Sequence, residues 1–311
     1  MSYLKFIDEV VNVLKKKVDE QLEIKYTTVC KNNGVNREGI TIRKQNEIVS
    51  PNIYLDNYYD RYCEGEGLDE ITDEILIFYE KAKLDCSFTK DDICDYSVIK
   101  DKIFFRLVNY EKNKEQLEDL PHIRYLDFAI TFHYLLTQQK GSIQSYCINK
   151  RLQNNWEVQI DELYQVALHN TPKLFPASIQ SMDQLLYDLL GRDLMEESLE
   201  ASKAMDLLGI TKSNKVPMYV MTNTKGVNGA TTLIYPKLLK SLASKVETSL
   251  YLLPSSIHEW IVIPYDKEFE PTTLKNMVLE VNQTQVPEEE ILSDEVYLYE
   301  KGTGIIERCF V

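Results

Sequence analysis

The sequence predicts an α+β fold with mixed or largely antiparallel sheets, packed helices and two subdomains. Amphipathic helical stretches alternate with short strand-like runs, without a regular strand-helix-strand rhythm or a GxGxxG fingerprint, so a doubly wound parallel sheet is disfavoured. The 311 residues are 44% hydrophobic and 10% aromatic, which is enough to fill a substantial core and argues against disorder. We expect an N-terminal α+β region over residues 1–100 and a C-terminal α+β region over residues 101–311, with 209–215 as a candidate sub-boundary.

The N-terminal region is predicted to form a helix, a hairpin and two further helices. An apolar stripe predicts the first helix, and Asn32-Asn33-Gly34 predicts the hairpin turn, because asparagine and glycine tolerate positive φ angles. The acidic run 64–74, with six carboxylates and no basic residue, fits a solvated helix start better than a docking site for a basic partner. The expected elements are a helix over 1–22, strands over 24–31, 39–44 and 50–55, and helices over 56–63 and 68–83.

The C-terminal region is predicted to mix strands and helices. Pro172 is expected to stop a helix and Pro271 to open one, because proline lacks the amide hydrogen that a helix interior needs. Gly141 is expected at a hairpin turn. The expected elements are strands over 102–109, 125–136 and 142–148, helices up to 120, over 161–168 and over 178–203, a flexible connection at 209–214, a strand over 218–222, a strand or helix start near 230–235, a helix over 236–246, strands over 249–253 and 259–263, a helix from 271 and a strand over 296–299.

Charge and cysteine usage exclude several classes of protein. The 35 basic and 49 acidic side chains give a formal net charge of -14, which repels phosphate backbones, so nucleic-acid binding is not expected. The six cysteines show no CxxC or CxxxC spacing, and we expect neither a metal site nor a cofactor. No stretch resembles a secretory signal or approaches the ~20 apolar residues of a membrane span, so we expect a cytoplasmic protein with free thiols and no membrane association.

The first candidate site is the segment Leu253 to Glu259, which sets Ser255, Ser256, His258 and Glu259 close together. A nucleophile, a base and an orienting carboxylate make a hydrolytic triad. Residues this close on a tight turn seldom point at one another in that way, and no GxSxG elbow is present. We therefore favour a turn whose serine hydroxyls bond local amides.

Two further candidates are ligand sites. The loop over 222–229 contains Asn223, Lys225, Asn228 and Gly229, whose backbone amides could cradle a small anion. The spacing is not that of a P-loop, and Asn-Gly pairs more often mark plain turns. Asn282 lies at the end of a predicted helix, where a capping role is sufficient to explain it.

The chain resembles a known family over almost its whole length. The motifs are KNNGV, SPNIYL, LVNYEKN, NTPKLFP, TNTKGVNGA, LPSSIHE and NQTQVPEEEILSDEVY. They are similar to a family of uncharacterised proteins from Gram-positive, largely anaerobic gut bacteria, with some members expected on mobile elements. The family is a domain of unknown function, so the resemblance implies no catalytic or binding residue.

The leading functional hypothesis is a non-enzymatic cytoplasmic binding or regulatory protein with a protein partner or a small ligand. Negative charge, a composition with 20 tyrosines and the lack of a catalytic signature motivate it. The first alternative is a hydrolase or transferase whose site joins the 254–259 turn to the 222–229 loop. The second is an acidic inhibitor or decoy in phage-host conflict. The sequence gives no oligomeric state.

Overall fold

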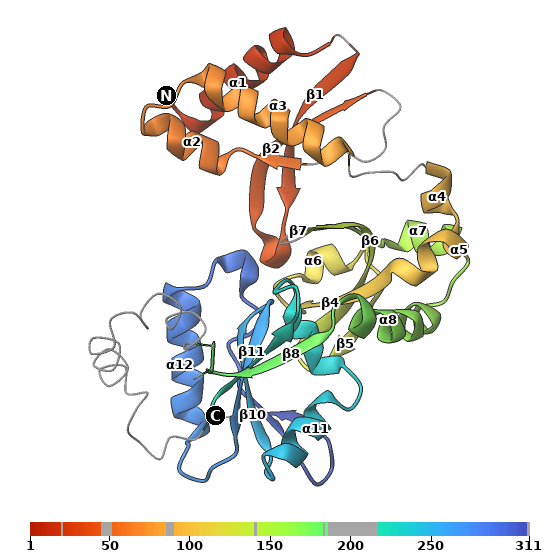
Figure 1. Cartoon of the computed structure of the whole chain (residues 1–311), viewed down its shortest axis with the longest axis vertical. Helices are drawn as coiled ribbons and strands as arrows, with labels where there is room; N and C mark the ends of the chain where they lie inside the picture. The colour runs from red at the N-terminus through yellow and green to blue at the C-terminus, as the bar shows by residue number, and fades with distance from the viewer. Residues whose placement is uncertain are drawn as a thin grey trace.

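The computed structural model describes residues 1–19, 21–44, 52–84, 90–139, 142–182, 184–185 and 217–309. These residues form helices packed on three sheets of antiparallel pairs, which confirms the predicted α+β fold (Figure 1). The helices are α1 (Tyr3–Lys17), α2 (Asp56–Cys63), α3 (Leu68–Leu84), α4 (Lys90–Cys94), α5 (Tyr96–Ile99), α6 (Lys114–Leu117), α7 (Lys150–Asn155), α8 (Ile160–Leu174), α11 (Leu238–Lys245) and α12 (Pro271–Thr284), with 3-10 turns η1 (Asn32–Gly34), η2 (Lys100–Lys102), η3 (Gly229–Ile234) and η4 (Glu288–Glu290).

The strands make sheets of three, four and six members. Their bounds are β1 (Leu22–Cys30), β2 (Asn36–Lys44), β3 (Asn52–Tyr54), β4 (Ile103–Asn109), β5 (His122–Tyr125), β6 (Phe128–Gln139), β7 (Ser142–Cys147), β8 (Ala177–Ser181), β9 (Tyr219–Asn223), β10 (Leu250–Ser256), β11 (Glu259–Pro264), β12 (Tyr297–Tyr299) and β13 (Ile306–Arg308). The orders are β1-β2-β3, then β4-β6-β5 with β7 also paired to β6, and β13-β12-β10-β11-β9-β8.

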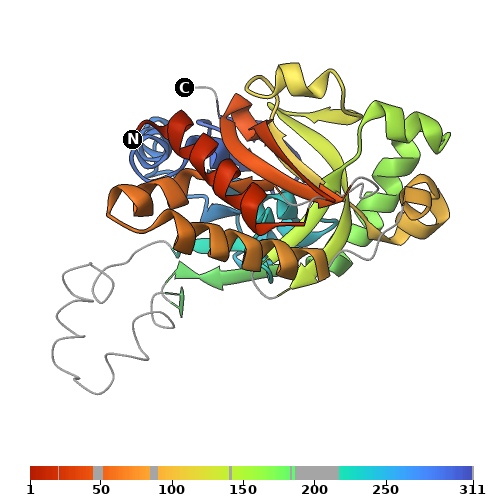
Figure 2. The same cartoon turned by 90° about the horizontal axis from the view of Figure 1, so that it is seen from above.

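The described residues between 1 and 84, here called the N-terminal unit, have a core of their own, and those from 90 onward are called the C-terminal unit. The helices α1 and α3 lie side by side on one face of the three-stranded sheet (Figures 1 and 2). Phe6, Ile42, Ile71 and Tyr79 are among the buried residues of this core, whose described members all lie between residues 6 and 79. Burial of such side chains contributes about 1.5–3 kcal/mol each, so this unit gains its stability largely from local partners.

The β1 and β2 strands form a long hairpin whose tip points away from this core toward the C-terminal unit (Figure 1). The predicted turn at Asn32-Asn33-Gly34 is confirmed, with φ of 60° at Asn33 and 74° at Gly34. Asparagine and glycine tolerate positive φ better than other residues, so they allow the chain to reverse direction at the tip of the hairpin.

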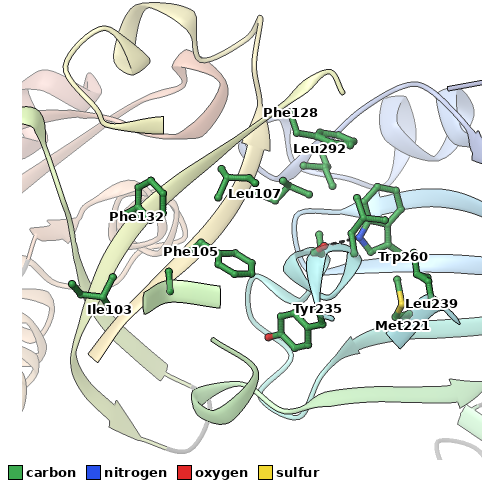
Figure 3. Packing of buried hydrophobic residues seen from close by; sticks show 14 of the residues in the cluster. Ile103, Phe105, Leu107, Phe128, Phe132, Met221, Tyr235, Leu239, Trp260 and Leu292 are labelled. Carbon is green, nitrogen blue, oxygen red and sulfur yellow. Dashed lines mark hydrogen bonds between the residues drawn. The ribbon is translucent and has the colours of Figure 1, made fainter. Parts of the chain in front are cut away.

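The four-stranded and six-stranded sheets share a second core. Phe105 and Phe132 from the former and Trp260 from the latter belong to one cluster of buried side chains (Figure 3). The Trp260 indole nitrogen donates to the Ala230 carbonyl at 2.8 Å, so its polar atom is satisfied inside the core. Helix α12 packs on the other face of the six-stranded sheet, where Leu274 and others form a smaller cluster.

Helix α8 flanks β4, which lies at the edge of the four-stranded sheet. The Thr171 hydroxyl accepts from the Phe105 amide at 3.2 Å, and the Asn170 amide donates to the carbonyls of Lys100 and Ile103 at 2.9 and 3.1 Å. An exposed strand edge invites pairing with other chains, and these side chains satisfy part of it.

Several sequence predictions were wrong in detail. Pro172 lies inside α8, which continues to Leu174, because the proline costs one amide bond that tertiary packing offsets. The first residues of the predicted helix 178–203 belong to strand β8, which pairs with β9, and most of the remainder lies outside the described residues. Gly141 and the connection 209–214 also lie outside them.

The two largest cores do not share residues. The first ends at Tyr79 and the second begins at Ile99. The division of the chain near residue 100 stays a prediction about units that fold independently. In the part of the chain that the structure describes, no helix combines the length and apolar character that a membrane span requires.

Candidate functional site

The 254–259 turn and the 222–229 loop lie against each other at one end of the six-stranded sheet. The Thr222 hydroxyl donates to the His258 carbonyl at 2.7 Å, and the Ala230 amide donates to the Ile257 carbonyl at 3.2 Å. The Asn228 amide donates to Nδ1 of His258 at 3.0 Å. Segments 30 residues apart are therefore joined by direct hydrogen bonds, two of them between backbone and side chain.

Gly229 is the point of closest approach between the two segments. A Cβ atom built there would lie 2.1 Å from the Thr222 hydroxyl, 2.3 Å from the His258 carbonyl oxygen and 2.9 Å from the Asn223 amide nitrogen. Only a residue without a side chain fits this position. The preceding Asn228 has a left-handed backbone with φ of 52°, which asparagine tolerates better than most residues.

The two nitrogens of the His258 ring are both engaged. Because Nδ1 accepts a backbone hydrogen bond, the neutral ring carries its proton on Nε2, which lies 3.5 Å from Oε1 of Glu290. A general base needs a free lone pair directed at the proton it removes. The lone pair of Nδ1 is occupied by the Asn228 amide, so the ring links the 254–259 turn to the 222–229 loop by a hydrogen bond.

The two serines hold the turn. The Ser255 hydroxyl donates to Oε1 of Glu259 at 3.2 Å, and the Ser256 hydroxyl accepts from the His258 amide at 3.0 Å. The strand β10 runs through both serines, and its pairing with β11 shifts register between Pro254 and Ser256. The hydrogen bonds of the described residues include none between either hydroxyl and the imidazole, which fits local serine-turn chemistry and gives no support to a nucleophile-base pair.

The remaining predicted ligand residues are also bonded locally. The buried Asn223 side chain donates to the Val227 carbonyl at 2.8 Å and accepts from the Lys225 amide at 2.9 Å. The amide of Lys225 is therefore turned toward its own loop instead of an anion. Asn282 was expected to cap its helix, but α12 continues to Thr284 and the buried Asn282 amide donates to the Ser293 carbonyl at 3.0 Å and to Asp294 at 2.8 Å.

The hairpin tip of the N-terminal unit contacts Asn113 and the segment 288–291. The Asn33 side chain donates to the carbonyls of Glu288 and Ile291, both at 2.7 Å, and accepts from the Asn113 amide at 3.0 Å. The Asn113 side chain in turn accepts from the Asn33 backbone amide at 2.9 Å. Asn32 adds a bond to the Glu289 carbonyl at 2.7 Å.

The turn η4 connects these two sets of contacts. Its Glu290 carbonyl accepts from the Ile257 amide at 2.8 Å, while its Glu289 carboxylate lies 3.0 Å from the Arg37 guanidinium on β2. We call this assembly the junction. It comprises the hairpin tip, Asn113, the segment 288–291, the 254–259 turn and the 222–229 loop.

A second polar group, missed by the sequence reasoning, lies on the face of the four-stranded sheet away from the shared core. Side chains alternate along strands, and Ile103, Phe105 and Leu107 enter the core, so Arg106 points the other way. The register places Arg106 opposite Thr131, with His133 two residues further along β6. The alternation of polar and apolar residues in both strands was the signal that could have revealed this face.

Comparisons with known proteins give one result on the family. A model of a family of unknown function (DUF5688) matches residues 3–301. Comparison with curated proteins and with solved structures found no match. Among the described residues, no group of three or more histidine, cysteine, aspartate or glutamate side chains is arranged to hold a metal ion.

Proposed function

We propose that this chain, which belongs to the DUF5688 family of unknown function, is a non-enzymatic binding or regulatory protein that works through the junction between its two units. The observation that carries the proposal is the composition of the junction. Five of the seven motifs that carried the resemblance contribute contacts to it: KNNGV, LVNYEKN, TNTKGVNGA, LPSSIHE and the segment that contains EEEIL. Most of the motifs that carry the family resemblance therefore take part in the contacts of the junction.

The chemistry of the junction supports binding over catalysis. The imidazole, the two hydroxyls and the loop amides described above all have partners within the protein. A hydrolase or transferase would need one of these groups to be directed at a substrate. A cytoplasmic setting, on a mobile element of a Gram-positive anaerobe, belongs to the same proposal.

The contacts of the hairpin tip support a regulatory mode. They are hydrogen bonds and one ion pair between Arg37 and Glu289, whose side chains are 36% and 26% exposed. Polar interfaces between units commonly permit relative movement. A ligand or partner that binds one arrangement better than another would shift the equilibrium between them.

Paired variants of the hairpin test this proposal. Asn33→Ala removes three side-chain hydrogen bonds of the tip, whereas Asn36→Ala alters an exposed asparagine of the same hairpin and is the matched control. Hydrogen exchange should show faster exchange at residues 288–291 in Asn33→Ala alone. Each protein is then used for partner capture from the native host and for a thermal-shift panel of metabolites.

The proposal predicts that the wild-type protein retains a stoichiometric partner or is stabilised by a ligand, and that Asn33→Ala changes the affinity by at least about fivefold, the lower end of typical couplings between sites. The Asn36→Ala protein should match the wild type. A wild-type protein that yields neither partner nor ligand, or equal affinity in all three proteins, would refute it.

A further inference from the structure

The outward face of the four-stranded sheet gathers basic and hydroxyl side chains in a chain with a net charge of -14. The pairing of the strands assigns Arg106, His122, Arg124, Thr131, His133 and Ser145 to this face, beside the apolar Phe104 and Leu135, which pack with Phe175 in a small buried cluster. Thr131 and His133 at its centre are buried, and the Thr131 hydroxyl lies 3.1 Å from Nε2 of His133.

Arg106 is the unusual member of this group. Its Nη2 atom donates to the Ser145 hydroxyl at 2.6 Å, and its guanidinium carbon lies 5.7 Å from the centre of the Phe104 ring. Its Nε atom is buried without a hydrogen-bond partner. Among the described residues, no carboxylate lies within 4.0 Å of this guanidinium.

The neighbouring titratable groups do not neutralise Arg106. Burial lowers the pKa of Arg106 to about 10, which still leaves it charged at neutral pH. Burial raises the pKa of the Cys147 thiol to about 11, although Arg106 acts in the opposite direction, so the thiol stays protonated. Burial and the nearby guanidinium hold the pKa of His133 well below its usual value, so this ring is uncharged.

A buried charge without a counter-ion is costly, and buried charges in proteins are normally paired. Arg106 is of intermediate burial as a whole residue, although its Nε atom is fully buried. The guanidinium fork forms two parallel hydrogen bonds with a carboxylate or a phosphate, which a hydroxyl such as that of Ser145 cannot do.

We propose that Arg106 is the centre of a binding site for a small oxyanion, a carboxylate or a phosphate, on this face of the sheet. The anion would supply the missing counter-charge and accept hydrogen bonds from the guanidinium, with the Ser145 hydroxyl beside it. Arg124, which stacks on Tyr110 at 4.3 Å, adds positive charge on the same face, although Glu111 lies 3.9 Å from it. This site lies outside the junction, and the proposal does not depend on the function proposed for that region.

The test uses the full chain with inorganic phosphate and malonate as probes. Sodium chloride at matched ionic strength controls for screening of charge. Thermal shift and calorimetry are measured for the wild type, Arg106→Gln, Arg106→Lys and Arg151→Gln. The last variant removes the same charge from an exposed position on α7 and is the matched control.

The wild type and Arg151→Gln should be stabilised by at least one probe beyond the chloride control. Arg106→Gln should bind at least about tenfold more weakly, because charge-assisted bidentate bonds are lost. In the sodium chloride buffer, without phosphate or malonate, Arg106→Gln should be no less stable than the wild type, since it removes an uncompensated charge. A purely structural arginine would instead lose stability in both buffers.

The two probes identify the class of ligand. Stabilisation by phosphate alone assigns a phosphate site, and stabilisation by malonate alone assigns a carboxylate site. Neither probe acting on the wild type, or equal binding by wild type and Arg106→Gln, would overturn the proposal. If Arg106→Gln does not fold, Arg106→Lys decides, because it keeps the charge but loses the fork and should still bind about tenfold more weakly.

Discussion

Replacing Gly229 by alanine should destabilise the C-terminal unit far more than replacing Gly226, three residues earlier in the same loop. The added Cβ would lie less than 3.0 Å from three atoms, two of which belong to the backbone at His258 and Asn223. To make room for the Cβ atom, the backbone at His258 and Asn223 would have to shift, and the hydrogen bonds of the junction resist that shift. Overpacking typically costs about 1–3 kcal/mol and occasionally more, so we expect a loss of at least about 3 kcal/mol. At Gly226 a Cβ meets nothing within 4 Å, and its φ of 67° should cost alanine only about 1–2 kcal/mol.

Urea unfolding followed by tryptophan fluorescence measures this difference. Both tryptophans of the chain, Trp156 and Trp260, belong to the C-terminal core, so the signal reports on that core alone. In thermal unfolding followed by the same fluorescence, the melting temperature of Gly229→Ala should fall by at least roughly 6 °C, since a domain of this size loses about 2–4 °C per kcal/mol. Equal losses in the two variants would show that the loop and the turn do not pack as closely as the structure has them.

Three further variants probe the junction and the core. Asn33→Asp keeps an acceptor but loses the donor to two carbonyls, so hydrogen exchange at the hairpin tip should accelerate. The tryptophan transition should change by no more than about 0.5 kcal/mol, because these bonds lie outside the core that contains both tryptophans. His258→Ala should lose about 1–2 kcal/mol in urea unfolding because the Asn228 amide loses its acceptor, and His258→Asn, which offers an oxygen near that place, should recover part of it; equal stability of both variants would contradict this. Burial raises the pKa of Tyr235 from 10.0 to about 12, so the stability it contributes is complete below pH 10 and is lost as pH rises from 10 to 12. Stability measured across that window should fall less steeply in Tyr235→Phe; an unchanged slope would refute the role of this hydroxyl, which donates to Phe175 at 2.7 Å.

The elements that local signals specify were predicted well. The helices α2 and α3 and the turn at Asn33 follow from periodicity and from residues that tolerate positive φ. The end of α8 was misplaced because packing at Asn170 and Thr171 overrides the cost of Pro172. Strand β8 was assigned to a helix because its partner β9 is about 40 residues away. The pattern of neighbouring residues does not show a strand pairing over that distance.

The contact between two of the candidate segments was anticipated, whereas the role of their residues in a functional site stays a prediction. The meeting of the 222–229 loop with the 254–259 turn follows from strand ends that share one edge of a sheet, and the hydrogen bonds to His258 fit that expectation. The sequence could not reveal that Asn33 and Glu288 would approach from separate regions, because nothing local relates them. Arg106 was missed because a charged residue in a strand is ordinarily solvated, and only the register shows that the residue opposite it is the buried Thr131.

The hairpin tip also imposes an order on folding during synthesis. Among the described residues, the buried members of the N-terminal core all precede position 80, so this unit has these contacts as soon as it leaves the ribosome. Its tip must then wait for Ile291, about 210 residues later, which takes roughly 10–40 s at 5–20 residues per second. During that interval the side-chain amides of Asn32 and Asn33 are solvated, until the segment 288–291 supplies their carbonyl partners. Closure of the junction is therefore a late event, because it requires synthesis to have passed residue 291.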